Sequence, residues 1–153
     1  MSRQQLNAQP VPPPPVAPNE AACLQIYVIF TTSSETAAAI RATKAMTDGL
    51  RAQISVLVAS EVPFPLPLDE PPIPVAFTEG RVREAVVHGD VPARVEILLC
   101  RDRLTAIRET LPARSLVIVG GRRRWYRHGP NKIARILKQD GHRVISVEDN
   151  KKL

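Results

Sequence analysis

The sequence predicts a three-layer α/β sandwich, in which a parallel β-sheet lies between two layers of helices. Five short aliphatic segments have the composition of strands that are buried on both faces. Segments with helical periodicity or helix-capping signals alternate with these strands, and this order along the chain favours a parallel sheet. Aromatic residues make up only 4% of the 153 residues, so the core must be built from Ile, Leu, Val and Ala.

The first predicted strand leads directly into the first predicted helix. Leu24–Phe30 is apolar enough to be buried on both faces. Thr32 and Glu35 have the spacing of a capping box, which predicts that a helix begins after Thr32. Gly49 ends this helix, whose last turn falls within 44–48. Four residues are expected on its inner face: Ala38, Ala42, Ala45 and Met46.

A second predicted strand, over 53–59, leads into a proline-rich segment. The six prolines from Pro63 to Pro74 exclude a helix or a central strand there. Large apolar side chains accompany the prolines, so we interpret the segment as a surface loop packed on the domain. A plain crossover connection and a lid over a pocket both remain open. The helix that follows, over 78–88, is expected to pack through Val82, Ala85 and Val86.

Three further strands and two further helices complete the predicted sandwich. Asp102 has the chemistry of an N-cap and Pro130 suits a first helical position, so each marks the start of a helix. The strands are expected over 94–99, 115–119 and 143–148, and the helices over 103–111 and 130–139. The inward-facing residues are expected to be Leu104, Ile107 and Leu111 in the first helix, and Ile133, Ile136 and Leu137 in the second.

The N-terminal segment 1–22 is predicted to be disordered. Six of its residues are prolines and large apolar residues are almost absent, which favours polyproline II over a packed structure. We interpret the segment as a tail or tether, with a ligand for a proline-recognising groove as the alternative. The expected domains are this tail, one α/β domain over 23–149 and a charged C-terminal end over 150–153.

Cysteine content and hydropathy indicate a reducing, cytoplasmic environment. Cys23 and Cys100 are too few for a disulfide framework and lack the spacing of a metal site. No apolar run approaches the ~20 residues that cross a membrane, and the N-terminus lacks the apolar core of a signal peptide. We therefore expect a cytoplasmic protein without membrane insertion. Cys100 is interpreted as a buried thiol, with an oxidant sensor of lowered pKa beside Arg101 as the alternative.

A glycine pair followed by a run of cations marks the candidate binding site. The strand over 115–119 leads into Gly120-Gly121 and then into an arginine-rich loop, in a chain of net charge +6. Glycine lets a backbone approach a ligand, helix N-termini favour anions, and arginine pairs bidentately with phosphate or carboxylate. Residues after the first strand belong to the same carboxyl edge of the sheet. The predicted anion site comprises Thr31, Thr32, Ser33, Gly120, Gly121, Arg122, Arg123, Arg124, Arg127, Gly129 and Asn131.

Several segments resemble the universal stress protein family, and together the resemblance covers about residues 22–149. Residues 116–122, Leu-Val-Ile-Val-Gly-Gly-Arg, are similar to the family's L-I-V-V-G-S-R segment. Leu24–Phe30 with the Ala-rich helix after it resembles the family's opening, and Asp102 resembles its Gly-Asp-helix step. The segments 129–137 and 142–147 are similar to its last helix and last strand.

The resemblance implies both a topology and a role. The fold would be Rossmann-like, with five parallel strands in the order 3-2-1-4-5. The role would be in a stress response, as a homodimer formed through the last strand, Arg143–Glu148.

The resemblance also implies a nucleotide site for ATP or AMP, but the family motif Gly-x2-Gly-x9-Gly-Ser/Thr is altered here. Gly120 takes the first glycine position, Arg123 the second, and Gly129 the third after a shortened spacing. Pro130 replaces the hydroxyl residue that follows, and the family's adenine-contacting Asp is a threonine within 31–32. We therefore expect an anionic small molecule, phosphate or a nucleotide in a degenerate site.

No catalytic constellation or metal site is recognisable in the sequence, so we expect a non-enzymatic regulatory domain, with a weak ATPase as an alternative. Two further alternatives remain open. One is a nucleic-acid-binding module that uses the arginine-rich loop, with Trp125 and Tyr126 stacking on bases, and the basic residues of the last helix. The other is a ligand-free dimeric interaction domain. The basic residues of the last helix are Lys132, Arg135 and Lys138.

Overall fold

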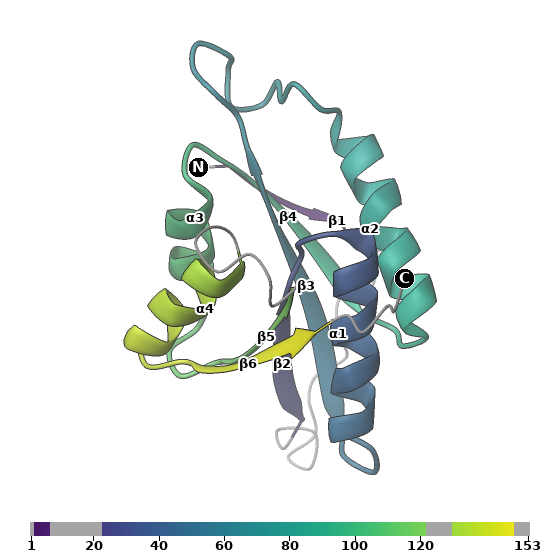
Figure 1. The fold of residues 1–153 in the computed structure, drawn as a ribbon. Helices are drawn as coiled ribbons and strands as arrows, with labels where there is room; N and C mark the ends of the chain where they lie inside the picture. The colour runs from purple at the N-terminus through teal and green to yellow at the C-terminus, as the bar shows by residue number, and fades with distance from the viewer. Residues whose placement is uncertain (1, 7–22, 122–129, 149–153) are drawn as a thin grey trace.

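The computed structural model describes residues 2–6, 23–121 and 130–148. These residues form one six-stranded sheet with helices on both of its faces (Figure 1). The strands are β1 (Ser2–Leu6), β2 (Leu24–Ile29), β3 (Ala52–Glu61), β4 (Arg94–Cys100), β5 (Leu116–Gly121) and β6 (Arg143–Glu148). The helices are α1 (Ser33–Met46), α2 (Val75–Gly89), α3 (Arg103–Thr110) and α4 (Pro130–Gln139).

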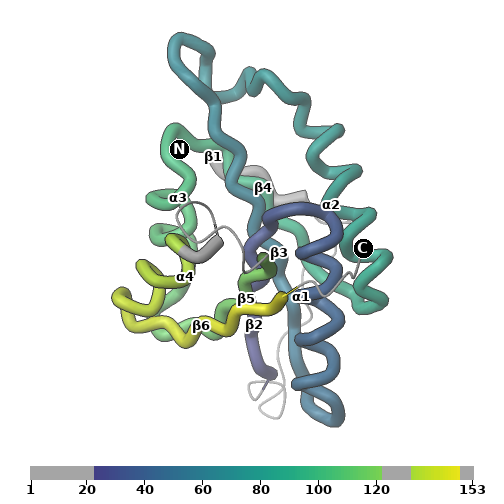
Figure 2. Tube along the Cα trace, in the orientation of Figure 1, coloured from purple at the N-terminus to yellow at the C-terminus, as the bar shows by residue number. Residues whose placement is uncertain are grey.

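The five predicted strands are confirmed, and they pair in parallel. β2 pairs with both β3 and β5, β3 pairs with β4, and β5 pairs with β6. Their order across the sheet is β4-β3-β2-β5-β6, which is the expected order 3-2-1-4-5. The chain first moves outward through β3 and β4 and then crosses to β5 on the other side of β2, a path that Figure 2 traces. The strand order therefore reverses between β2 and β5.

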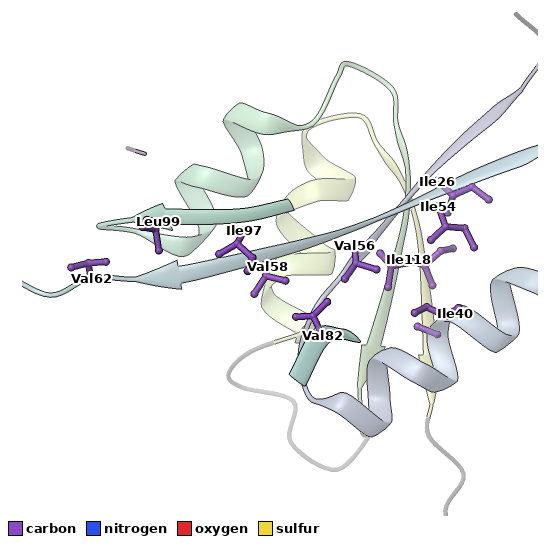
Figure 3. Close-up of a cluster of buried hydrophobic side chains, with 12 residues drawn as sticks. Ile26, Ile40, Ile54, Val56, Val58, Val62, Val82, Ile97, Leu99 and Ile118 are labelled. Carbon is purple, nitrogen blue, oxygen red and sulfur yellow. The ribbon is translucent and has the colours of Figure 1, made fainter. Parts of the chain in front are cut away.

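Two aliphatic cores hold the three layers together, one on each face of the sheet. α1 and α2 cover one face, and α3 and α4 cover the other (Figure 1). Successive residues of a strand point to opposite faces, so Val28 lies in the first core and Ile29 in the second. Figure 3 shows the first core, to which Ile40 of α1 and Val82 of α2 contribute. Burial on both faces explains why the strands are nearly continuous aliphatic runs.

The inner face of α1 differs from the predicted one. Ala38 and Ala42 are only half-buried, Ala45 is exposed, and Met46 is 47% exposed. The helix is rotated from the expected position, so that a stripe with the spacing i, i+3, i+4 and i+7 faces the sheet. The buried residues of α1 are Thr36, Ala37, Ala39, Ile40 and Thr43.

Two buried threonines account for this difference. The Thr43 hydroxyl donates a hydrogen bond to the backbone oxygen of Ala39 at 2.7 Å. The Thr36 hydroxyl oxygen accepts one from the backbone N–H of Thr31 at 3.2 Å. Because their polar atoms are satisfied locally, both threonines can be buried at little cost. A prediction based on apolar residues alone therefore chose the wrong face.

The other helices follow the predictions closely. α2 begins at Val75, directly after Pro74, rather than near Thr78. Six of the residues predicted to face inward are buried: Val82, Ala85, Ile107, Leu111, Ile133 and Leu137. Three others are half-buried: Val86, Leu104 and Ile136. The additional buried positions are Gly89, Ala106 and Ala134.

No helix within 2–6, 23–121 and 130–148 has the length and apolar composition to span a membrane.

β1 is a strand that the sequence did not predict. It pairs antiparallel with β4, from Ser2 opposite Leu99 to Leu6 opposite Val95. A largely polar segment can take this place because an edge strand is held by backbone hydrogen bonds. The prediction of disorder over 1–22 is therefore wrong for residues 2–6. The rest of that segment and the C-terminal end 150–153 lie outside the described residues.

Candidate functional site

Part of the predicted anion site lies at the carboxyl ends of β2 and β5, where the strand order reverses. The hydroxyl of Thr31, just after β2, donates a hydrogen bond to the backbone oxygen of Gly120 at 3.1 Å. These residues are 89 positions apart in the sequence. The fold therefore brings together two segments that the sequence assigned to one site, at the kind of switch point where parallel sheets bind ligands.

The N-terminus of α1 lies at the same corner. Thr32 is the N-cap, as predicted, and its side chain accepts a hydrogen bond from the backbone N–H of Glu35 at 3.2 Å. Thr32 is exposed and Ser33 is half-buried. The positive end of the helix dipole thus meets solvent at the carboxyl edge of the sheet, which is a favourable place for an anion.

Gly120 is required by packing between α1 and β5. A Cβ atom added to Gly120 would lie 2.3 Å from the backbone oxygen of Glu35 and 3.4 Å from Cβ of Ala39. The first distance is too short for any side chain, so only glycine lets α1 approach β5 this closely. Space for α1 therefore accounts for this glycine without a ligand.

Arg81 of α2 adds a cation beside this corner that the sequence did not predict. The Ser33 hydroxyl donates to the backbone oxygen of Arg81 at 3.4 Å. The Arg81 guanidinium lies 5.8 Å from the centre of the Phe30 ring. α1 and α2 cover the same face of the sheet (Figure 1), and this packing brings Arg81 to the start of α1. No local sequence pattern links residues that are 48 positions apart.

The arginine-rich part of the predicted site is outside the described ranges. Five of the predicted residues belong to this part. The backbone of Asn131 lies in the first turn of α4. Gly121 ends β5 opposite Glu148 of β6. The basic residues predicted on α4, Lys132, Arg135 and Lys138, are all exposed. The five residues outside the described ranges are Arg122, Arg123, Arg124, Arg127 and Gly129.

Two carboxylates at the ends of β3 and β4 hold the start of α3. Glu61 Oε1 accepts a hydrogen bond from the backbone N–H of Arg103 at 3.2 Å. Asp102, the predicted N-cap, accepts from the backbone N–H of Thr105 at 2.9 Å and also from the Thr105 hydroxyl. These hydrogen bonds lower the pKa of Asp102 because they stabilise its charged form, and the positive charge of Lys132 acts in the same direction.

Cys100 is a buried thiol, as preferred from the sequence. Its side chain is 1% exposed, and Sγ donates to the backbone oxygen of Ser60 at 3.6 Å. Burial raises the pKa of Cys100, and the nearby negative charge of Glu61 raises it further. The alternative of an oxidant-sensing thiol of lowered pKa is therefore wrong.

The proline-rich segment between β3 and α2 is a packed surface loop, as predicted. Nη1 of Arg101 donates to the backbone oxygens of Val62 at 2.9 Å and Leu66 at 2.8 Å. The same guanidinium lies 4.0 Å from the centre of the Phe64 ring. Leu66 and Leu68 pack against the first core, whereas Phe64 is 79% exposed. Contacts from β4 and from the core therefore anchor the loop to the domain.

Neither a metal centre nor a match to known proteins adds to this geometry. Within the described ranges, no group of three or more His, Cys, Asp or Glu side chains is placed to hold a metal ion. The chain matches no protein-family model, and a comparison with curated proteins also found no match. The resemblance to universal stress proteins thus rests on the segments and the element order given above.

Proposed function

We propose that the chain is a universal-stress-protein-like regulatory domain that binds an anionic small molecule or a nucleotide between the carboxyl ends of β2 and β5. The hydrogen bond from Thr31 to Gly120 carries the proposal, because it joins both predicted segments at the point where the strand order reverses. The exposed start of α1 and the guanidinium of Arg81 support it, because both favour negative charge at this edge.

The hydrogen bonds that the side chains at this corner already make support binding without turnover. The Thr32 hydroxyl accepts a hydrogen bond from the backbone N–H of Glu35. The hydroxyls of Thr31 and Ser33 donate to the backbone oxygens of Gly120 and Arg81, respectively. Among the described residues, none of these hydroxyls is hydrogen-bonded to a side chain that acts as a general base. A phosphate or carboxylate can still accept hydrogen bonds from N–H groups at the start of α1 and pair with Arg81.

A thermal-shift screen of the full chain tests the proposal. The panel contains ATP, AMP, inorganic phosphate and a short DNA duplex, each at low and moderate salt. A nucleotide at ~100 times its dissociation constant should add about 2.7 kcal/mol to the free energy of unfolding. We expect this stabilisation with a nucleotide, and we expect Arg81→Gln to weaken nucleotide binding. Arg83→Gln removes the same charge from the same helix and should leave binding unchanged.

The same screen distinguishes the nucleic-acid alternative, which the exposure of Lys132, Arg135 and Lys138 on α4 favours. Stabilisation by the DNA duplex alone, and only at low salt, would indicate binding to a basic surface through counterion release. That result, or equal loss of nucleotide binding in Arg81→Gln and Arg83→Gln, would contradict a site between β2 and β5.

A further inference from the structure

A hollow with cationic and apolar walls lies at the opposite edge of the sheet, near the first residues of β2, β5 and β6. Its volume is about 580 Å³, which falls within the roughly 300–1,000 Å³ typical of small-molecule sites. Leu24, Tyr27 and Leu116 contribute apolar surface, and Arg114 and Arg143 contribute positive charge. None of the described residues that line the hollow is an Asp or a Glu.

The two arginines of this hollow have no partner for their guanidinium groups among the described residues. Both side chains are exposed. The ion pairs in the described part of the chain use other cations, namely Lys44, Arg83, His88 and Arg108. Guanidinium groups without a carboxylate partner favour a ligand anion, so an anion in this hollow that pairs with them would be stabilised.

Buried hydrogen bonds fix the backbone that carries both arginines. Ser115, next to Arg114, donates its backbone N–H to Nδ1 of His142 at 3.1 Å and its hydroxyl to the backbone oxygen of Pro112. Arg143, next to His142, donates its backbone N–H to the oxygen of Ser115 at 3.0 Å. Ser115 is 7% exposed and His142 is 9% exposed. A ligand would therefore not have to order this backbone, which lowers the entropic cost of binding.

Arg114 has a backbone conformation that arginine rarely adopts. Its φ is +57°, in the left-handed region. Glycine or asparagine occupies this region with less strain. An arginine at this turn therefore costs stability, and in return it adds a cation at the hollow.

We propose that the hollow binds a small molecule that carries a carboxylate or phosphate group on an apolar or aromatic body. The anionic group pairs with Arg114 and Arg143, and the body contacts Leu24, Tyr27 and Leu116. This site is distinct from the one proposed between Thr31 and Gly120, because the two lie at opposite ends of β2 and β5.

NMR titration of the ¹⁵N-labelled full chain tests this site. The probes are phenyl phosphate and benzoate, with inorganic phosphate as the anion alone and benzyl alcohol as the aromatic body alone. We expect saturable shifts of the amides in 24–27, 113–116 and 141–143 with phenyl phosphate or benzoate. Inorganic phosphate lacks the apolar contacts and benzyl alcohol lacks the contacts with the arginines. Each should therefore bind at least about tenfold more weakly than phenyl phosphate or benzoate. Whichever probe binds more tightly identifies the anionic group.

Matched variants separate binding from folding. Arg143→Ser and Arg114→Gly should each weaken probe binding about tenfold, the effect of losing one charge-assisted hydrogen bond. Arg114→Gly should also raise the melting temperature, because glycine relieves the strain at φ +57°. Its loss of affinity could then not be attributed to unfolding. Arg51→Ser, directly before β3 and outside the hollow, should bind the probes like the unmodified chain.

Three results would overturn the proposal. The first is the absence of saturable shifts in the hollow with every probe, including the case in which shifts occur only around 31–33 and 120–121. The second is equal affinity for inorganic phosphate and phenyl phosphate, which would indicate a basic patch without an apolar subsite. The third is equal weakening by Arg51→Ser and Arg143→Ser, which would indicate diffuse electrostatic attraction.

Discussion

Two glycines set how closely α1 can approach its neighbours. A Cβ atom on Gly120 would lie 2.3 Å from the backbone oxygen of Glu35, and one on Gly89 would lie 2.6 Å from Cγ2 of Ile40. A rotamer change would not relieve the clash at Gly89, because Cβ of Ile40 would still lie 2.7 Å from the added atom, and the Glu35 oxygen belongs to the backbone of α1. Both glycines are therefore required by the packing of α1.

Gly120→Ala should destabilise the protein by about 1–3 kcal/mol, the usual cost of overpacking, or more. The matched control is Gly80→Ala in the middle of α2, where an added Cβ has no neighbour within 4 Å. That variant should instead stabilise the protein by about 0.4–1 kcal/mol, because alanine loses less backbone entropy on folding. Urea unfolding measures both changes. A destabilisation by Gly120→Ala no larger than the effect of Gly80→Ala would show that α1 shifts easily on β5.

Features that depend on a few neighbouring residues could be predicted from the sequence, and those that depend on distant residues could not. The caps at Thr32 and Asp102 were predicted because each bonds to a residue three positions away. The packing role of Gly120 depends on Glu35 in another element, and the sequence alone offered only the ligand interpretation of this glycine. Arg81 reaches the site through the packing of α2 beside α1, which no local pattern indicates.

At the scale of elements, strand and helix positions could be predicted more reliably than the orientation of a helix. Buried parallel strands are distinct aliphatic runs, and caps mark the helix starts, so the order of elements from β2 to β6 is confirmed. The face of α1 depends on Thr36 and Thr43, which are buried because the helix satisfies their hydroxyl groups. β1 depends on the exposed edge of β4, which is a property of the assembled sheet.

The proline-rich loop between β3 and α2 offers a test at the same scale. Arg101→Ala removes two hydrogen bonds to loop carbonyl groups and the stacking on Phe64. We expect a loss of about 1–3 kcal/mol in the free energy of unfolding, the usual range for hydrogen bonds from a charged donor. Hydrogen exchange should accelerate most over 62–74, as measured by mass spectrometry of peptic peptides. Arg103→Ala is a neighbouring control, because only the backbone of Arg103 bonds to Glu61. Faster exchange over 62–74 in the control alone would contradict the anchoring role of Arg101.

At the scale of the whole molecule, the fold places anion-attracting groups at two opposite edges of the sheet. Thr31, Gly120 and the start of α1 lie at the carboxyl edge, and Arg114 and Arg143 lie at the amino edge. The proposed site at the carboxyl edge could be anticipated because switch points of parallel sheets bind ligands as a rule. The hollow at the amino edge is built from the starts of three strands and two turns, and no rule of topology indicates it.

The outer edge of β6 gives the last prediction. In the described part of the chain, β6 pairs with β5 alone and ends the sheet. The backbone N–H of Arg143 donates to Ser115, next to β5. Because N–H groups alternate in direction along a strand, those of Val144 and Ser146 point away from β5, where a second copy could pair with them.

Ser146→Pro should therefore weaken a homodimer formed through Arg143–Glu148 while leaving the bonds between β5 and β6 intact. Proline removes an outward-facing donor at an exposed edge position, where it is tolerated in a sheet. We expect sedimentation equilibrium to show a dimer for the unmodified chain and for the control Ser146→Thr. The dissociation constant of Ser146→Pro should be raised about tenfold, the effect of losing about 1.4 kcal/mol. A monomer at every concentration would rule out this dimer, and equal dimerisation of the two variants would move the interface away from β6.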